Sequence, residues 1–338
     1  MSDAVLARER AHSTVPEPAP RPTPVPAYGA ALSNIAVALP ETRVSNVVVA
    51  ERAGVDPAWI VSRTGIEERR HAAPGETLVD LAARAGASAL AQAQVDALDV
   101  DLLLVATATP DAVLPATAPL VAHALGATRA GALELGAACT GFISGLSVAA
   151  AAVESGRAET VLVIGAEILS RYVDPSDRGT APIFGDGAGA GLVTRTDGPG
   201  RIGPVVLGAD GAGGPSLCAS RERGVIEMDG PEVFRHAIAR MGEATLAACE
   251  RAGVELADVD LFVYHQANAR ILRSLTQRLG LDPEKVVDCI GPHGNTSAAS
   301  IPIALDAARR DGRLIDGATV LVSAFGAGFT WGGVILEW

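Results

Sequence analysis

Short segments of this chain recur in the same order at a nearly constant distance, which restricts the folds that it can adopt. Val100-Asp101-Leu102 returns as Val259-Asp260-Leu261, 159 residues later. Ser155-Gly156-Arg157 likewise returns as Asp311-Gly312-Arg313, and each of these glycine turns precedes an aliphatic run. Chance similarity among Ala-, Gly- and Val-rich segments is the alternative. Because the matches keep their order and spacing, we favour an internal duplication.

A duplication predicts two similar halves, which we place at about residues 30–198 and 199–338. If the halves pack about a pseudo-twofold axis, equivalent turns from the two halves converge. The repeat places Cys139-Thr140 on Asn295-Thr296. We therefore expect helix N-termini that start at these two positions to meet.

Aliphatic runs alternate with Ala-rich stretches through both halves. Strands that alternate with helices are typical of an α/β fold with much parallel sheet. The runs expected to form buried strands are Leu102–Val105, Val161–Ile164, Leu261–Tyr264 and Val320–Ser323. The stretches expected to form helices include Leu78–Gln94, Phe142–Ser155 and Glu232–Ala252.

Residues 1–29 differ from the rest of the chain. Proline occupies every second position from Pro16 to Pro26. Proline fixes φ and lacks an N–H group, so this segment cannot form a helix or a central strand. We interpret it as a Pro-rich disordered or polyproline-like tail, with a partner-binding ligand as the alternative.

The composition excludes several classes of protein. Among 338 residues, 49% are hydrophobic, which is enough for a large core and argues against a disordered chain. The net charge of −12, from 27 basic and 39 acidic residues, disfavours a nucleic-acid binder. No secretory leader is visible, and no apolar stretch reaches the roughly 18–20 residues that span a membrane. We expect a cytoplasmic protein.

Cys139 is the strongest candidate for a reactive residue. It follows the run Ala132–Leu135 and precedes Gly141 and an Ala-rich helix. A cysteine at a strand-to-helix turn lies at the positive end of the helix dipole, which favours the thiolate. Small neighbours leave room for a substrate carbonyl. The remaining cysteines form no Cys-x-x-Cys pair and are interpreted as small buried hydrophobic residues: Cys218, Cys249 and Cys289.

The second half offers two polar candidates. His265 follows an expected strand, and strand ends are where α/β folds place reactive groups. Asn295 precedes a helical stretch, so an ordinary N-cap is the alternative for it. His293 is a rival that we treat as a loop residue. The glycine-rich turn at 326–328 is suited to present a backbone N–H group to an oxyanion.

Taken together, several motifs resemble those of β-ketoacyl-acyl-carrier-protein synthase III, a family of the thiolase superfamily. The motifs run in order along the chain from about residue 30 to Trp338. They are Trp59–Ile66, Ala137–Phe142, Asp174–Thr180, His265–Asn268, Gly294–Ser300 and Phe325–Phe329. The resemblance implies a five-layered αβαβα fold of two duplicated halves, assembled as a homodimer.

The resemblance also assigns roles to single residues. It implies that Cys139 is the acyl-accepting nucleophile and that His265 and Asn295 complete the triad. The backbone N–H groups of Cys139 and Gly328 would form the oxyanion hole. Leu114 matches a residue that closes the acyl pocket of the dimer partner. The positions that match the coenzyme A and pantetheine site are Trp59, Arg63, Arg178, Phe184, Phe234, Ala267 and Asn268.

The implied reaction is a decarboxylative Claisen condensation of an acyl-CoA with malonyl-acyl carrier protein, through an acyl-cysteine and without a metal or other cofactor. Since the carrier is acidic and this chain is also acidic, docking needs a local basic patch. The candidate residues, for which ordinary solvated arginines are the alternative, are Arg235, Arg270, Arg273 and Arg278.

Related functions remain open on the sequence. The same triad permits transfer of the acyl group to an amine or hydroxyl, or the priming of a polyketide. A non-catalytic carrier-binding subunit is a further alternative, but an intact Cys139, His265 and Asn295 argue against it. Asn295 stands where chain-elongating condensing enzymes carry a second histidine, and the C-terminal glycine turn lacks the further cysteine of thiolases.

Overall fold

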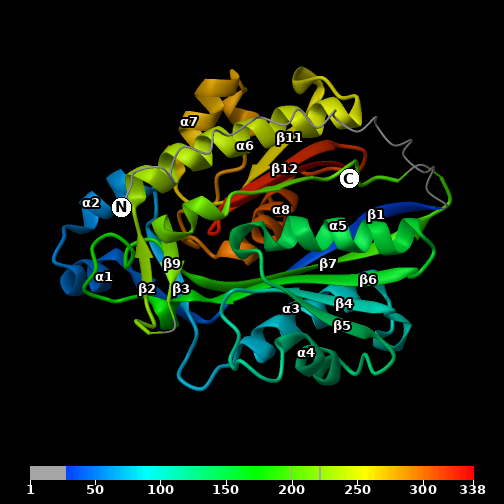
Figure 1. Ribbon diagram of the computed structural model, residues 1–338, viewed down its shortest axis with the longest axis horizontal. Helices are drawn as coiled ribbons and strands as arrows, with labels where there is room; N and C mark the ends of the chain where they lie inside the picture. Colours follow the sequence, from blue (N-terminus) through cyan, green and yellow to red (C-terminus); the bar gives the residue numbers. More distant parts are fainter. Residues whose placement is uncertain (1–27, 199, 221) are drawn as a thin grey trace, which may run out of the picture.

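The computed structural model describes residues 28–198, 200–220 and 222–338 (Figure 1). In the first half the elements are β1 (Gly29–Ala38), β2 (Thr42–Ser45), α1 (Asn46–Ala53), α2 (Pro57–Thr64), β3 (Glu68–His71), α3 (Leu78–Ala93), β4 (Leu102–Ala106), α4 (Thr117–Leu125), β5 (Gly131–Leu135), α5 (Gly141–Glu154), β6 (Thr160–Ile168) and β7 (Asp186–Thr196). In the second half they are β8 (Val206–Ala209), β9 (Leu217–Ala219), β10 (Ile226–Met228), α6 (Gly230–Ala252), β11 (Leu261–Tyr264), α7 (Ala269–Leu279), α8 (Ser300–Arg310), β12 (Thr319–Gly326) and β13 (Thr330–Glu337).

Two central sheets share one strand arrangement. The first has the order β1-β7-β6-β4-β5, and the second has the order β8-β13-β12-β11. In the first sheet β4 pairs with β6 in parallel, whereas β7 is antiparallel to both of its neighbours. In the second sheet β11 and β12 are parallel, and β13 is antiparallel to both of its neighbours. Four strands of the first sheet, β1-β7-β6-β4, thus repeat as β8-β13-β12-β11, which confirms the duplicated α/β fold.

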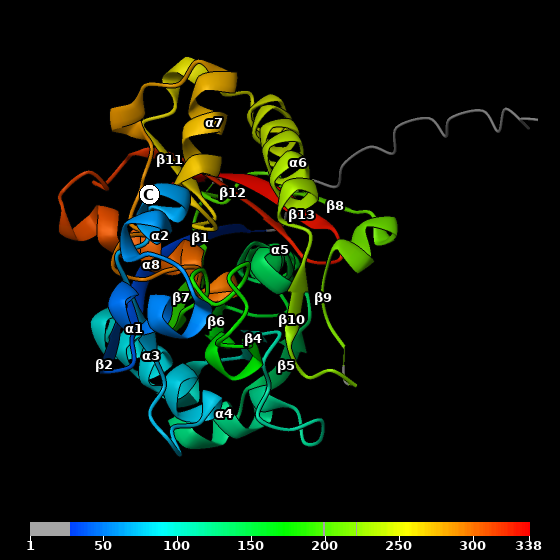
Figure 2. The ribbon, with the colours of Figure 1, turned by 90° about the vertical axis from the view of Figure 1, so that its left-hand side faces the viewer.

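Helices cover both faces of each sheet, so that the molecule has five layers (Figures 1 and 2). Helices α3 and α4 lie against the outer face of the first sheet. Helices α5 and α8 contact strands of both sheets and form the middle layer. Helices α6 and α7 pack on the outer face of the second sheet. This is the αβαβα arrangement that the sequence motifs imply.

Local sequence explains why the expected elements form. Thr77 and Asp80 form a capping box at the start of α3, and Leu78, Leu81 and Ala85 are buried on one face of that helix. All residues of β6 after Thr160 are buried, as in a central strand covered on both faces. The expected strands and helices are therefore confirmed, with ends shifted by a few residues.

Both chain boundaries expected from the sequence fall at or next to residues outside the described part of the chain. Of the expected Pro-rich tail, residues 1–27 lie outside the described residues, and Gly29 is already the first residue of β1. The expected boundary between the halves falls after β7, next to Pro199, which is also outside the described residues. Within the described part of the chain, no helix combines the length and apolar character needed to cross a membrane.

Candidate active site

Cys139 lies in a 3-10 turn, Ala138–Thr140, that connects β5 with the middle-layer helix α5. Its side chain is only 7% exposed. Ala138 has a φ of +45°, a left-handed conformation that costs energy for a residue with a Cβ. Gly326, at the end of β12, packs directly against this turn, because a Cβ added there would lie 2.7 Å from Cys139 N. Both halves therefore hold the nucleophile.

The duplication brings a matching turn to Cys139. The turn Ser297–Ala299 precedes α8 as Ala138–Thr140 precedes α5, and the two turns are in contact. Ser297 has a φ of +47°, close to that of Ala138, its equivalent 159 residues earlier. The structural equivalent of Cys139 is thus Ala298, and the expected equivalence with Asn295 is wrong by three residues. The N-termini of α5 and α8 nevertheless meet as expected.

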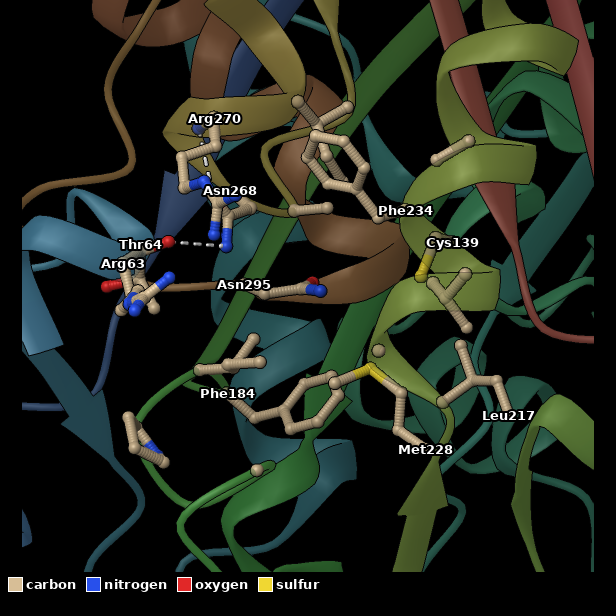
Figure 3. A pocket seen from close by; sticks show the side chains of 18 of the residues that line it. Arg63, Thr64, Cys139, Phe184, Leu217, Met228, Phe234, Asn268, Arg270 and Asn295 are labelled. Carbon is tan, nitrogen blue, oxygen red and sulfur yellow. Dashed lines mark hydrogen bonds between the residues drawn. The ribbon is translucent and has the colours of Figure 1, made fainter. Parts of the chain in front are cut away.

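A cavity of about 830 Å³ leads to Cys139 and includes the other two expected catalytic residues in its wall (Figure 3). His265 follows β11, and Asn295 lies in the loop before α8. The residues expected to bind coenzyme A also line this cavity: Trp59, Arg63, Arg178, Phe184, Phe234, Ala267 and Asn268. The structure therefore brings the triad and these residues together around one space.

The cavity wall is mostly apolar and carries cations on one side. Arg178 lies over the ring of Trp59, 5.1 Å from its centroid. Asn268 donates from Nδ2 to the carbonyl oxygen of Arg63 at 3.2 Å, a contact drawn in Figure 3. The Arg270 guanidinium lies 5.5 Å from the ring centroid of Phe234. Arginines and aromatic rings together suit an anionic ligand with a flat, stackable group.

His265 is buried and is oriented by one side chain. Its Nδ1 lies 2.6 Å from Ser300 Oγ, at the first position of α8. Burial lowers the pKa of His265 to about 3, so the imidazole is neutral around pH 7. A neutral ring with a hydroxyl at Nδ1 can present Nε2–H as a donor to the cavity.

Asn295 is fixed by its backbone and by its side-chain carbonyl. Its N–H donates to Ile183 O at 2.9 Å, and its C=O accepts from Gly185 N at 3.0 Å. Its Oδ1 accepts from Ser297 N at 2.8 Å. The side-chain amide group is left as the donor that faces the cavity.

The thiol of Cys139 is neutral at rest, in contrast to the expected thiolate. Burial raises the pKa of Cys139 to about 12, and the negative charge of Glu167 raises it further, while a hydrogen bond with the Ser297 side chain lowers it. The helix dipole favours the thiolate, but desolvation of the buried sulfur disfavours it more strongly.

Comparison with known proteins decides the family. The family models described as 3-oxoacyl-[acyl-carrier-protein] synthase III and its C-terminal part match residues 133–211 and 249–338. β-Ketoacyl-[acyl-carrier-protein] synthase III 2 of Streptomyces coelicolor is 48% identical over 312 residues, covering 92% of this chain and 94% of that protein. The corresponding enzyme of Symbiobacterium thermophilum is 45% identical and covers 91% and 97%.

The chain belongs to the β-ketoacyl-acyl-carrier-protein synthase III family. It is therefore an acyltransferase of the condensing type. The crystal structure of the synthase III of Aquifex aeolicus matches with a TM-score of 0.88 and 40% identity, covering 92% of this chain and all of that one. The priming β-ketosynthase of the R1128 polyketide pathway matches with a TM-score of 0.89 and 39% identity, covering 94% and 98%.

A second cavity, of about 660 Å³, reaches Cys139 of this synthase from the side of β5. Its wall includes Tyr172, Cys218 and the loop 108–113. Leu114, which follows this loop, is 84% exposed and lines neither cavity of its own chain. Leu114 thus takes no part in this chain's site as described.

In the glycine turn 326–328, the residues that line the cavities beside Cys139 differ from the expected Gly328. Gly326 lines the first cavity and Ala327 lines the second, in each case together with Cys139. Gly328 lines neither of them. Gly326 and Ala327 therefore lie closer to the nucleophile's cavities than Gly328 does, and the identity of the second oxyanion donor stays a proposal.

The arginines of the expected docking patch are exposed on the two helices that cover the second sheet, Arg235 on α6 and the others on α7. Arg235 is paired on its own helix, with Glu232 at 2.6 Å. Among the described residues, no carboxylate pairs with Arg270, Arg273 or Arg278. These three keep their charge available to a partner.

Sequence reasoning missed three polar residues around the triad of this synthase: Glu167, Ser297 and Ser300. Both serines lie within a quoted motif, but no role was assigned to them. Glu167 had a visible signal, since it is a single acidic residue in the otherwise apolar strand β6. A buried carboxylate in such a strand needs hydrogen-bond partners, which indicates a functional or structural cluster.

Proposed function

We propose that the protein takes an acyl group from an acyl-CoA onto Cys139 and condenses it with malonyl-acyl carrier protein, with loss of CO₂. The observation that carries this proposal is the shared cavity of Cys139, His265 and Asn295. One nucleophile and two neutral donors face one space there. The names of the related synthases support the same reaction, which needs no cofactor beyond the thioester itself.

Acylation depends on the sulfur of Cys139 and on backbone N–H groups next to it. The sulfur attacks the thioester carbonyl, and the developing oxyanion would accept from the N–H groups of Cys139 and Ala327. One such donor contributes about 3–4 kcal/mol in comparable sites. Coenzyme A would thread the first cavity, with its phosphates near Arg63 and Arg178 and its adenine against Trp59.

Decarboxylation uses the two neutral donors. Loss of CO₂ from the malonyl group places negative charge on the thioester oxygen as an enolate. Nε2–H of His265 and the side-chain amide of Asn295 would stabilise that oxygen without protonating the carbanion. The carbanion then attacks the acyl carbonyl on Cys139 and expels the sulfur, which yields the β-ketoacyl thioester.

A test separates the two half-reactions. Asn295→Ala should accept an acyl group on Cys139 but release CO₂ from malonyl-acyl carrier protein about a hundredfold more slowly, because one of two enolate donors is lost. Acyl-enzyme is measured by intact mass, and CO₂ release is measured in a coupled assay. Normal condensation by this variant would reduce Asn295 to a structural residue of the loop.

Carrier-protein docking is proposed at the unpaired arginines of α7. Arg270 lies at the wall of the first cavity, and Arg273 is exposed one turn further along the helix. An acidic carrier whose pantetheine arm enters this cavity would meet these charges first.

A homodimer is proposed through the edge of the first sheet. Strand β5 is the last strand of that sheet, and its Leu133 is 51% exposed. Val113 and Leu114, in the adjacent loop, are also exposed apolar residues. Pairing with a second copy would cover the edge strand and place loop residues over the partner's second cavity.

The match to a priming β-ketosynthase of a polyketide pathway supports a second candidate function, the priming of polyketide synthesis. Fatty-acid initiation and polyketide priming use the same condensation and differ in the acyl starter, so the acyl preference of this protein decides between the two functions. The second cavity has room for acyl groups larger than acetyl, which agrees with a branched or longer starter.

A further inference from the structure

Glu167 lies at the centre of the site but outside the triad. It belongs to β6, and its side chain is fully buried. A carboxylate is costly to bury unless hydrogen bonds replace its water shell. Its position beside the nucleophile, where its charge raises the pKa of Cys139, calls for an explanation beyond packing.

The carboxylate is held by polar groups on both sides. Its Oε2 accepts from Thr109 Oγ1 at 2.6 Å and from Thr107 Oγ1 at 3.3 Å, and both oxygens lie 3.1 Å from Ala108 N. Its Oε1 accepts from Ser297 Oγ at 3.0 Å. These partners come from the end of β4 and the turn before α8, and none of them is charged.

Ser297 connects this carboxylate to the nucleophile. Its hydroxyl donates to Glu167 Oε1 at 3.0 Å. Ser297 and Cys139 lie on two turns that are in contact, and both line the second cavity, so the same hydroxyl is within reach of the sulfur. A hydroxyl can accept from one neighbour while it donates to the other, and both hydrogen bonds can reverse together. The row of sulfur, hydroxyl and carboxylate is therefore a path along which one proton can move.

Their pKa values make Glu167 a better acceptor than His265 for the thiol proton of Cys139. Burial raises the pKa of Glu167 to about 7, whereas burial lowers the pKa of His265 to about 3. His265 also uses Nδ1 for Ser300. Because Glu167 and Cys139 repel each other when both are ionised, the pair is suited to carry one negative charge, on either the carboxylate or the sulfur.

We propose that Glu167 stores the proton of Cys139, which it receives through the hydroxyl of Ser297. Ser297 contacts the reacting sulfur, and Glu167 acts through Ser297. The inference deepens the proposed acyl-transfer function and rests on it for its role in the cycle. In the resting state the thiol is protonated and the carboxylate is ionised; in the reactive state the sulfur is ionised and the carboxyl is protonated.

The cycle balances. The thiolate attacks the thioester, coenzyme A leaves as its thiolate, and that thiolate takes a proton from water after release. The stored proton stays on Glu167 during the acyl-enzyme stage. When condensation expels the Cys139 thiolate, the proton returns through Ser297, which restores a neutral thiol and an ionised carboxylate.

The test follows alkylation of Cys139 by iodoacetamide, read by peptide mass spectrometry, between about pH 6 and about pH 9. The resting and reactive states hold the same number of protons. The wild-type rate should therefore rise with pH up to about the pKa of Glu167, near 7. It should then level off over the pH range in which repulsion between Glu167 and the sulfur suppresses the state with both groups ionised. In Glu167→Gln the rate should instead rise about tenfold per pH unit over the whole range, since the proton then leaves to water.

Control variants complete the test. Glu159→Gln, which removes an exposed carboxylate just before β6, should keep the wild-type profile. Ser297→Ala should lower the plateau about tenfold, because the hydroxyl no longer stabilises the thiolate. If Glu167→Gln does not fold, the plateau measured for Ser297→Ala decides the test by itself. A wild-type rate without a break, a break that persists in Glu167→Gln, or an unchanged plateau in Ser297→Ala would each overturn the proposal.

This readout needs no acyl-CoA. A protein that shows the plateau but accepts no acyl group would contradict the proposed function and leave the proton path standing. A protein that is acylated but shows no plateau would contradict the proton path and leave the proposed function standing.

Discussion

His265 Nδ1 lies 2.6 Å from the hydroxyl of Ser300, so the imidazole at the end of β11 is tied to the first turn of α8. The imidazole is neutral, because burial lowers the pKa of His265 to about 3. If Ser300 donates to Nδ1, the ring proton stands on Nε2, the atom that the proposed decarboxylation needs as a donor.

Ser300→Ala should therefore slow decarboxylation more than acylation. We expect the rate of CO₂ release from malonyl-acyl carrier protein to fall about tenfold or more, because the ring is no longer held in one tautomer. The acylation rate from acyl-CoA should stay within about twofold of wild type, measured by quenched-flow mass spectrometry. Equal losses in both steps would assign Ser300 a structural role instead.

Gly326→Ala should strongly slow acyl transfer. The added Cβ would lie 2.7 Å from Cys139 N and 3.2 Å from Cys139 Cβ, so the nucleophile turn has to shift. Displacement of an oxyanion donor should cost about a hundredfold or more in the acylation rate. Gly136→Ala is the matched control, since nothing lies within 4 Å of a Cβ added there, three residues before the nucleophile. Full activity in Gly326→Ala would contradict the described packing.

Protein stability should fall on acidification, in part through His293. Burial, with Arg70 and Arg310 nearby, lowers the pKa of His293 to about 4 from 6.5. The unfolded chain takes up this proton first as the pH falls, so the contribution to stability is present above pH 6.5 and lost as the pH falls toward 4. Glu167 acts in the opposite sense, because its folded pKa is raised from 4.5 to about 7.

The variant His293→Asn should isolate this effect. Its free energy of unfolding should decrease less than that of wild type between about pH 7 and about pH 5, by up to about 2 kcal/mol. Urea denaturation followed by circular dichroism measures the difference. Parallel pH curves for the two proteins would show that His293 is not kept neutral by folding.

Replacing Arg270 and Arg273 with Glu should weaken carrier-protein binding and spare Cys139 acylation. The two unpaired charges then repel an acidic carrier, so KM for malonyl-acyl carrier protein should rise about tenfold or more, and more strongly at low salt. Arg157→Glu, exposed beyond the far end of α5, is the control for a charge change. A salt-independent KM in the double variant would place docking elsewhere.

The sequence predicted the parts of the fold that follow from periodic burial. Strand β6 was predicted from its continuous aliphatic run and helix α3 from its Ala-rich stretch, because both signals lie within the local sequence. The triad was predicted through motif resemblance, since Cys139, His265 and Asn295 come from loops far apart in the chain, and the structure brings the three residues to one cavity. The repeat located the two converging turns, although it aligned Cys139 three residues away from its structural equivalent.

What escaped prediction depends on three-dimensional surroundings. The neutral thiol follows from desolvation between two sheets, which no run of residues around Cys139 reveals. Glu167 and Ser297 are 130 residues apart and meet only because the turn before α8 packs against β6 in the middle of the molecule. Similarly, which residue of the glycine turn faces Cys139 depends on how β12 ends, and sequence alone does not specify that within one residue.

The most direct test of the acyl-transfer account is the intact mass of the protein after mixing with acetyl-, isobutyryl- and longer acyl-CoAs. The account predicts an increase equal to one acyl group, located on Cys139 by peptide mapping, absent in Cys139→Ala and discharged by malonyl-acyl carrier protein. No increase with any of these thioesters, or an increase that persists in Cys139→Ala, would contradict it.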